Sequence, residues 1–324
     1  MSELAAIVLA AGKSTRIKSE RAKVLHELCG RPMLDYVLDA VRAAGADRVL
    51  VVVGFGASEV RAAYAGQPGL EFVQQAEQLG TGHATQVCRE SFKAHDGPVL
   101  VIAGDSALVR GESLVRLREI FDRERPACLV ATGVLDDPTG FGRIVRGPQG
   151  EFLRIVEHKD ATDAERQIRE INPSCYLFNG RDLFEALDEV RPQNVQKEYY
   201  LTDCVAILRD GGKKVMASAV LGGDEALGIN SRVDLAAAER VLQERIHERW
   251  MLEGVTITDP QSTYIDARAK IGRDTVILPS TVIGGPVEIG AGCRIGPFAY
   301  LHGNLRLPDA SVVGPFQELG SPSS

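Results

Sequence analysis

Strand and helix patterns alternate along roughly the first 220 residues of the chain. Apolar runs typical of buried strands cover residues 5–10, 48–53, 98–103 and 127–134. Helically spaced apolar residues follow the first run, at Met33, Leu34, Val37, Leu38 and Val41. This alternation predicts an α/β fold with a mostly parallel sheet covered by helices on both faces. Ligands of such sheets bind beyond the carboxyl ends of the strands, where Gly12 and Asp105 lie.

A strict six-residue period replaces this alternation near residue 253. Apolar residues recur at every sixth position, at Ile265, Ile271, Ile277, Ile283, Ile289, Ile295, Leu301, Leu307 and Val313. This period is typical of hexapeptide β-helices, in which three hexapeptides form one triangular coil around a stacked apolar core. The repeat therefore predicts a β-helix of about three coils over residues 253–316.

A helix is predicted between the two patterns, because an apolar stripe at helical spacing runs through Leu235, Ala238, Leu242 and Ile246. The predicted organisation is an α/β domain over residues 1–230, a connecting helix over 231–252, the β-helix over 253–316 and a disordered tail over 317–324.

Composition narrows the class of protein. The 324 residues carry a formal net charge of -7 and a pI of about 5.5, which argues against nucleic-acid binding. No apolar run reaches membrane-spanning length, and the acidic start of the chain argues against a signal peptide. The six cysteines are scattered without a C-x-x-C pair, which is typical of reduced cysteines in a cytoplasmic protein and disfavours a zinc site.

The segment "AAGKSTR" at residues 10–16 contains the last letters of a nucleotide-binding phosphate loop. The opening glycine of that loop would fall at Ile7, inside the first predicted strand, so this motif is disfavoured. The small residues Ala10, Ala11 and Gly12 nevertheless allow the backbone to approach an anion with its N–H groups. An ordinary turn between a strand and a helix, with exposed basic residues, remains the alternative.

Several segments together resemble a known family. They are "LAAGKSTRIKSERAKVLHELCGRPM", "QQAEQLGTGHA", "GFGRIVRGPQGEFLRIVEHKDAT", "EINPSCYLFNG", "QKEYYLTD" and "GINSRVDLAAAERVLQERI". They resemble the sugar-phosphate nucleotidyltransferases, and in particular the uridylyltransferase domain of GlmU-type enzymes, over about residues 3–316. The resemblance implies a Rossmann-like nucleotidyltransferase domain followed by a left-handed β-helix. It also implies Mg²⁺-dependent transfer of uridylate from UTP to N-acetylglucosamine-1-phosphate, giving UDP-N-acetylglucosamine and pyrophosphate.

The same resemblance implies roles for the residues at matching positions. Nucleotide contacts are implied for Ala10, Ala11, Gly12, Gln75, Gly80 and Thr81. Catalytic contacts with the reacting phosphates are implied for Arg16 and Lys23, and Mg²⁺ ligation for Asp105 and Asn230. Contacts with the sugar-1-phosphate are implied for Gly142, Glu157, Asn172, Tyr200 and Thr202.

The residue types suit this chemistry on physical grounds. A sugar phosphate has a second pKa near 6 and is largely ionised at neutral pH, so its attack on UTP needs no general base. Two polyanions must instead be brought together, which calls for fixed cations and a metal ion. Asp105 with an amide oxygen such as that of Asn230 suits Mg²⁺, which takes few protein ligands. Alternatively, Asp105 caps a helix and Lys23 is solvated.

Departures from the family pattern leave alternatives open. Ala22 stands where the family usually has proline, and Pro173 and Ser174 stand where it usually has threonine and glycine. These changes motivate another sugar-1-phosphate as the substrate of the same chemistry. A catalytically silent nucleotide-sugar sensor is a further alternative, although retention of both cations and both metal ligands argues against it. A dinucleotide-dependent oxidoreductase is disfavoured, since no G-x-G-x-x-G follows the first strand.

The β-helix pattern is shorter than in full-length members of the family, which continue into an acetyltransferase site. We therefore expect no acetyl transfer. Short repeat domains gain stability from neighbours, so we expect the β-helix to serve assembly, as a homotrimer like that of the family.

Overall fold

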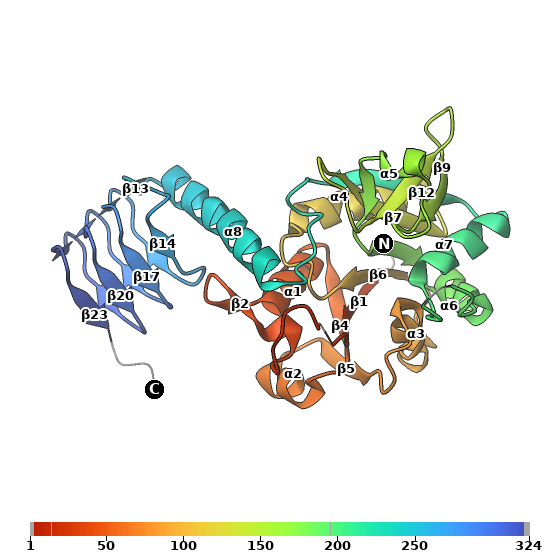
Figure 1. Cartoon of the computed structure of the whole chain (residues 1–324). Coiled ribbons are helices and arrows are strands. Elements are labelled where there is room, and N and C mark those ends of the chain that lie inside the picture. Colours follow the sequence, from red (N-terminus) through yellow and green to blue (C-terminus); the bar gives the residue numbers. More distant parts are fainter. Residues whose placement is uncertain (1–2, 14, 195, 321–324) are drawn as a thin grey trace. The chain divides into compact units, whose positions relative to one another are not determined.

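The computed structural model describes residues 3–13, 15–194 and 196–320, and it divides into two compact units (Figure 1). Unit 1 comprises Met1–His26 and Met33–Arg232, and unit 2 comprises Glu27–Pro32 and Val233–Ser324. The chain therefore passes between the units three times. Residues 27–32, which the sequence pattern placed in the first domain, belong to the second unit.

Unit 1 is built on a ten-stranded sheet with the order β5-β4-β1-β6-β11-β7-β10-β8-β9, while β12 pairs with β7. The first four strands of this order are parallel to one another. Their bounds are Leu70–Gln74 for β5, Ala46–Val53 for β4, Leu4–Ala10 for β1 and Pro98–Ala103 for β6. They include three of the four predicted strands, and the carboxyl ends of β1 and β6 are adjacent.

The other half of the sheet mixes strand directions. Its strands are β7 (Cys128–Val134), β8 (Gly142–Arg146), β9 (Phe152–Val156), β10 (Glu170–Asn172), β11 (Cys175–Asn179) and β12 (Val215–Leu221). Strand β12 is parallel to β7, whereas β11 is antiparallel to both β6 and β7. Strands β8, β9 and β10 are also joined by antiparallel pairing. The expected parallel arrangement thus holds for the half of the sheet that contains β1, and antiparallel strands extend the other half.

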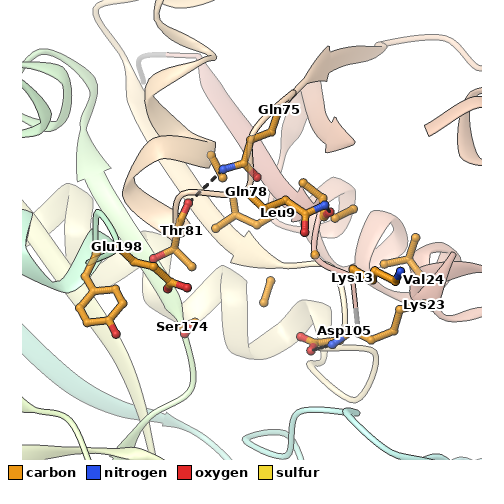
Figure 2. Close-up of a pocket in the computed structure, with 17 residues that line it drawn as sticks. Leu9, Lys13, Lys23, Val24, Gln75, Gln78, Thr81, Asp105, Ser174 and Glu198 are labelled. Carbon is orange, nitrogen blue, oxygen red and sulfur yellow. Dashed lines mark hydrogen bonds and ion pairs between the residues drawn. The ribbon is translucent and has the colours of Figure 1, made fainter. Parts of the chain in front are cut away.

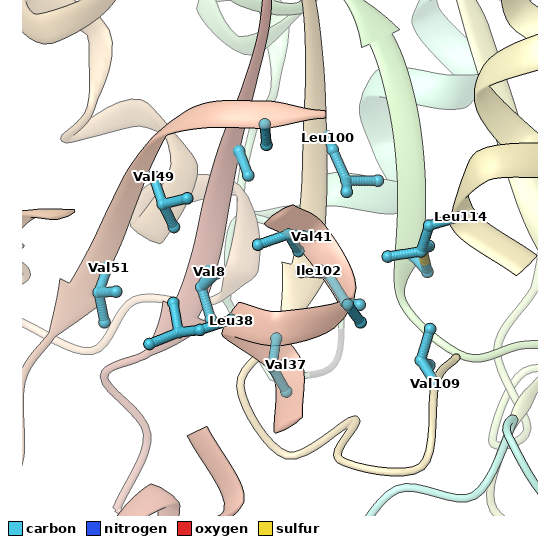
Figure 3. Close-up of a cluster of buried hydrophobic side chains, with 14 of the residues drawn as sticks. Val8, Val37, Leu38, Val41, Val49, Val51, Leu100, Ile102, Val109 and Leu114 are labelled. Atoms are coloured by element: carbon cyan, nitrogen blue, oxygen red, sulfur yellow. The ribbon is translucent and has the colours of Figure 1, made fainter. Parts of the chain in front are cut away.

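The helices of unit 1 are α1 (Met33–Ala43), α2 (Ala57–Ala63), α3 (Thr81–Gln86), α4 (Gly111–Glu124), α5 (Asp163–Arg166), α6 (Gly180–Glu189) and α7 (Leu201–Asp210). Two short 3-10 helices, η1 (Lys23–Leu25) and η2 (Arg89–Phe92), complete the set in the described residues. Successive side chains of a strand point to opposite faces, so β1 contributes Val8 to one apolar cluster and Ile7 to another. Figure 3 shows the first cluster, where Val8, Leu100 and Ile102 of the sheet meet Val37 and Val41 of α1.

Unit 2 contains the hairpin β2 (Glu27–Leu28) and β3 (Arg31–Pro32), helix α8 (Arg232–Leu252) from its second residue on, and a parallel β-helix. The β-helix strands are β13 (Thr256–Ile257), β14 (Tyr264–Ile265), β15 (Lys270–Ile271), β16 (Val276–Ile277), β17 (Val282–Gly284), β18 (Glu288–Ile289), β19 (Arg294–Ile295), β20 (Tyr300–His302), β21 (Arg306–Leu307), β22 (Val312–Val313) and β23 (Glu318–Gly320). They form three parallel sheets, and each strand pairs with the third strand on, as Ile265 pairs with Ile283. The fully buried Ile265, Ile277 and Ile283 confirm the predicted six-residue core.

One detail of unit 2 differs from the sequence expectation. Residues Glu318–Gly320 form β23 and pair with β20, so the expected disorder from residue 317 is wrong for these three residues. Residues 321–324 lie outside the described part of the chain. At the other end of the β-helix, β13 lies within the predicted range and pairs with β16, with Ile257 beside Ile277.

The hairpin is held within unit 2 by its tip. The N–H of Cys29 donates to the carboxylate of Glu239 on α8, at 3.0 Å from Oε2, and its carbonyl accepts the N–H of Ala267 at 2.9 Å. Gly30 has a φ of +79°, and a Cβ there would lie 1.7 Å from the Asp266 carboxylate. Only glycine fits this position, because a side chain would be both strained and in collision.

Two further observations concern the whole described chain. All six cysteines are unpaired and buried, as their scattered positions predicted. Within residues 3–320, apart from the two undescribed positions, the helices are too short or too polar to cross a bilayer.

Candidate active site

A cavity of about 380 Å³ lies in unit 1 at the carboxyl ends of β1 and β6 (Figure 2). Its lining comes from segments far apart in sequence: Leu9, Ala10, Ala11, Gly12, Lys13, Lys23, Val24, Gln75, Gln78, Gly80, Thr81, Ala84, Ala103, Asp105, Ser174, Glu198 and Tyr200. The position agrees with the rule for ligand sites in α/β sheets. All the residues assigned to the nucleotide from the sequence are among these residues.

The turn after β1 is fixed by hydrogen bonds to its backbone. The carbonyl of Ala11 accepts the N–H of Phe55 at 3.1 Å and the side-chain Nε2 of Gln78 at 2.9 Å. Gly12 and Lys13 remain exposed, and the Lys13 ammonium lies 5.1 Å from the centre of the Phe55 ring. Ser14 lies outside the described residues. The turn therefore presents small residues and one cation to the cavity.

A second wall is formed where residues 75–83 meet the start of α7. The buried side chain of Gln75 donates from Nε2 to the carbonyl of Gly80 at 3.1 Å. The Thr81 hydroxyl accepts the N–H of Leu201 at 3.1 Å, and the carbonyl of Tyr199 accepts the N–H of Gly82 at 2.7 Å. Gly80 has a φ of +106°, and a Cβ there would lie 2.5 Å from the Tyr199 carbonyl oxygen. This wall depends on a close approach that glycine permits.

The side chain of Lys23 and the two proposed metal ligands, Asp105 and Asn230, converge at one point. The ammonium of Lys23 forms an ion pair with the Asp105 carboxylate, and it also donates to Oδ1 of Asn230 at 3.0 Å. The Lys23 and Asp105 side chains are 15% and 16% exposed. The carbonyl of Asp105 accepts the N–H of Ile229 at 3.3 Å, which links the two loops that bear the oxygen ligands. Asn230 is thus brought to Asp105 although 125 residues separate them in the sequence.

Arg16, the other predicted catalytic cation, is exposed and lies outside the set of described residues that line the cavity. Lys13 lines the cavity instead, although the sequence analysis did not assign it a role. Gln78, Ser174 and Glu198 are also lining residues that were missed as site residues. Gln78 and Glu198 belong to motif segments used for the resemblance, so their signal was present in the sequence.

The predicted sugar contacts lie partly around a second cavity of about 270 Å³, which Tyr200 lines together with Glu157 and Thr202. Tyr200 lines both cavities. Burial and the nearby Asp160 and Asp203 raise the pKa of Glu157. Burial, with Glu198 next in effect, raises the pKa of Tyr200 to about 12. The site therefore offers hydroxyl and carboxyl groups that suit sugar hydroxyls.

Gly142 and Asn172 are paired across β8 and β10, beside this second cavity's Glu157. A Cβ at Gly142 would lie 3.5 Å from the carboxylate oxygens of Glu157. The Asn172 amide is buried, donates to the Tyr176 hydroxyl at 2.7 Å and accepts the N–H of Ser174 at 3.3 Å. Ser174, with a φ of +61°, lines the first cavity, whereas Asn172 supports the turn beneath it.

The oxygen donors of Asp105 and Asn230 fit a magnesium ion in type and in convergence, because both already surround one cation. Over the described residues, no three His, Cys, Asp or Glu side chains are grouped to hold a metal ion. A metal ion at Asp105 and Asn230 would therefore have two protein oxygen ligands, and phosphate oxygens and water would complete its shell.

The fold and its sequence matches define the class of protein. Residues 6–201 match the MobA-like NTP transferase domain family, and residues 268–303 match the bacterial transferase hexapeptide (six repeats). A structure of UDP-glucose pyrophosphorylase complexed with UDP-glucose superposes with a TM-score of 0.62 at 17% identity, covering 76% of this chain and 100% of that one. The chain is a nucleotidyltransferase with hexapeptide repeats, which are consistent with a left-handed β-helix.

Curated relatives then identify the family. The bifunctional protein GlmU of Halalkalibacterium halodurans is 44% identical over 317 residues, which cover 97% of this chain and 69% of the relative. The bifunctional protein GlmU of Geobacillus sp. (strain WCH70) is 46% identical over 292 residues, covering 90% of this chain and 63% of the relative. The chain belongs to the GlmU family, as the sequence motifs indicated.

Proposed function

We propose that this nucleotidyltransferase joins UTP and N-acetylglucosamine-1-phosphate to give UDP-N-acetylglucosamine and pyrophosphate. The observation that carries the proposal is the convergence of Lys23, Asp105 and Asn230 at the cavity beside the Gln75–Thr81 wall. This arrangement combines a cation, two oxygen ligands for a metal ion and a cavity large enough for part of a nucleotide. Membership of the GlmU family supports the same substrates, because the resemblance to GlmU-type enzymes implies them.

In the proposed reaction an oxygen of the sugar phosphate attacks the α-phosphorus of UTP. A bond forms between that oxygen and phosphorus, and the bond to the bridging oxygen breaks, so that pyrophosphate leaves with the electron pair. The attacking phosphate is already largely ionised at neutral pH, so no residue has to remove a proton. The chain's own contribution is therefore to hold the two phosphates in line and to balance their charge.

Each polar group has a part in this task. Lys23 neutralises charge on the phosphates, and the Ala11 and Gly12 backbone lets a phosphate approach the turn after β1. Asp105 and Asn230 would hold Mg²⁺, which supplies charge neutralisation to the phosphate oxygens when it is bound. Gln75, Gly80 and Thr81 form the wall proposed for the uracil, and Glu157, Tyr200 and Thr202 the side proposed for the sugar.

A second candidate substrate is favoured by one observation. Ser174 lines the first cavity in a conformation with positive φ, next to Pro173, which has no N–H to donate. A hydroxyl at this position changes the hydrogen bonds available to the sugar, so the same transfer to another sugar-1-phosphate is the alternative. The silent nucleotide-sugar sensor remains as the alternative without chemistry.

Assembly through unit 2 is a further part of the proposal. Phe298 and Phe316 are exposed and stack with ring centres 5.1 Å apart, and Tyr300 and Val312 are further exposed apolar residues of the repeat. Exposed apolar residues of this kind favour association, and a homotrimer is the expected form. Sedimentation velocity at micromolar concentration tests it, because a stable monomer would contradict assembly.

Pyrophosphate release tests the reaction. The purified chain is incubated with UTP, Mg²⁺ and N-acetylglucosamine-1-phosphate, in parallel with glucose-1-phosphate and galactose-1-phosphate, and Asp105→Ala serves as the control. We expect release to be fastest with the N-acetylated sugar and to fall by about 10²–10³-fold in Asp105→Ala. Release only with another sugar would support the second candidate, and UTP binding without release would support the sensor.

A further inference from the structure

The Lys23 ammonium occupies the point where the oxygen ligands of Asp105 and Asn230 meet. Figure 2 shows the Lys23 side chain directed toward Asp105 at the edge of the cavity. Both groups are largely buried, so their ion pair is a charge-assisted interaction with little screening by water. A cation of the chain itself therefore lies where a metal ion would bind.

An ammonium and a divalent metal ion cannot share this position. Both would need the Asp105 carboxylate, and two cations within about 4 Å repel each other strongly in a partly buried site. A free metal ion has to break the ion pair before it binds, and the displaced ammonium then needs another anion. Free metal therefore binds against competition from a residue of the chain itself.

The chain around Lys23 restricts what can move. Val24 and Leu25 of η1 are buried, and the N–H of Leu25 donates to the carbonyl of Ala22 at 3.0 Å. The N–H of Ala22 in turn donates to Oε2 of Glu59 at 3.1 Å. The backbone is thus anchored on both sides of Lys23, while the long lysine side chain lines the cavity and can turn within it.

We infer that Lys23 holds the metal position in the free protein, so that the metal ion enters together with the nucleotide. Nucleotide phosphates attract the ammonium away from Asp105, and they also supply the oxygen ligands that two protein donors leave missing. The species that the site accepts is then a metal–nucleotide complex, and the free dication binds weakly. This inference rests on the metal ligands assigned under the proposed function.

The test measures metal binding without turnover. Mn²⁺ is titrated into the nucleotide-free protein, and the electron paramagnetic resonance signal of free Mn²⁺ gives the dissociation constant. We expect Lys23→Met to bind Mn²⁺ about tenfold more tightly than the wild type, because a competing charge-assisted hydrogen bond is gone. This gain is expected although the same variant loses the proposed uridylyl transfer.

Lys13→Met is the matched control. Lys13 lines the same cavity and carries the same charge, but its ammonium lies over the Phe55 ring. If competition at Asp105 is the cause, this variant changes Mn²⁺ affinity by less than about twofold, since general charge reduction near a solvated group has a small effect. The double variant Lys23→Met with Asp105→Asn should lose the gain in Mn²⁺ affinity. That loss would show that the bound ion is held by Asp105.

A second measurement uses the wild-type protein, so it does not require that any variant folds correctly. The side-chain ε-methylene signal of Lys23 is followed by NMR in protein with ¹³C-labelled lysine. We expect little change with Mg²⁺ alone and a clear shift with Mg²⁺ and UTP together. Equal or weaker Mn²⁺ binding by Lys23→Met, or a full shift with Mg²⁺ alone, would overturn the inference.

The experiments separate this inference from the proposed function. They contain no sugar phosphate and need no product, so a protein that never releases pyrophosphate can still show the Mn²⁺ gain in Lys23→Met. Conversely, if the protein is active with N-acetylglucosamine-1-phosphate but Lys23→Met does not bind Mn²⁺ more tightly, the proposed function stands and the inference about Lys23 is wrong.

Discussion

The two units differ in how far apart in the sequence their interacting residues lie. In unit 1, Lys23 binds Asn230 across 207 positions and Asp105 across 82. In unit 2, most strands of the β-helix pair with a strand 18 residues on, as Tyr264 pairs with Val282. The first pattern brings unlike residues to one point, whereas the second repeats one environment along an axis.

This difference explains why the candidate active site lies in unit 1. A cavity with a cation, a carboxylate and an amide at fixed distances requires segments that differ from one another. A repeat gives every coil a similar core residue and a similar outer face, which suits stacking and assembly. Changes at single positions near the cavity of unit 1 should therefore affect nucleotide binding, whereas changes in unit 2 should affect stability or assembly and leave nucleotide binding unchanged.

The largest effect is expected for Gly80→Ala in unit 1. The new Cβ would lie 2.5 Å from the Tyr199 carbonyl oxygen, at a φ of +106°. Strain and collision should destabilise the fold by about 4 kcal/mol and weaken UTP binding through the displaced Thr81. Urea denaturation and calorimetric titration with UTP measure the two effects.

Gly12→Ala is its matched control for stability, because a Cβ at Gly12 has no atom within 4 Å. Its free energy of unfolding should change by less than about 0.5 kcal/mol. If both variants were equally stable, the wall formed with Tyr199 would not limit the residue at position 80.

The next effect concerns the repeat. Ile283→Ala removes a fully buried core side chain of β17, which pairs with Ile265 and Leu301 on either side. The loss should be about 3 kcal/mol in the stability of unit 2, with UTP binding unchanged. Val282→Ala, at the half-exposed neighbouring position, should cost less than about 1 kcal/mol. Weaker UTP binding in Ile283→Ala would contradict the view that nucleotide binding depends on unit 1 alone.

The smallest effect tests an ion pair inside unit 1. The Glu170 carboxylate accepts hydrogen bonds from Nε of Arg146 at 2.7 Å and from the hydroxyl of Thr132 at 2.6 Å. Burial alone raises the pKa of Glu170, but the bonds from Arg146 and Thr132 outweigh it and the pKa is lowered. A lowered folded-state pKa gives stability that is present above the unfolded value and is lost as pH falls through the folded one.

We therefore expect Glu170→Gln to lose about 2 kcal/mol near pH 7, where the wild-type carboxylate is charged. The difference between the two proteins should shrink as the pH falls below about 4.3, the unfolded-state pKa of glutamate. Urea denaturation across this range measures it. A difference independent of pH would show that charge at Glu170 does not contribute.

The sequence was most informative where its pattern is local. The six-residue period predicted the core of the β-helix because each strand repeats the same requirement. The apolar runs before Gly12 and before Asp105 predicted two strands with the ligand site beyond their carboxyl ends, and the structure pairs these strands, β1 and β6, at the cavity.

The features of the fold and of the site that were not predicted depend on contacts between distant residues, which no local sequence pattern encodes. The antiparallel strands β8 and β10 are short and their apolar content is low, so pairing rather than periodicity defines them. The ion pair between Lys23 and Asp105 was not predicted, because both residues were assigned to ligands rather than to each other. The side-chain bonds of Asn172 to its own turn were hidden for the same reason.

The six-residue hairpin at residues 27–32 makes unit 1 discontinuous along the chain. Leu28 and Cys29 are fully buried, and the main chain of Cys29 is bonded to Glu239 and Ala267 of unit 2. A recombination event near residue 232 would therefore not exchange the β-helix unit cleanly, since the hairpin would stay behind without its partners. A replacement β-helix unit would therefore also need matching changes in residues 27–32, near the N-terminus.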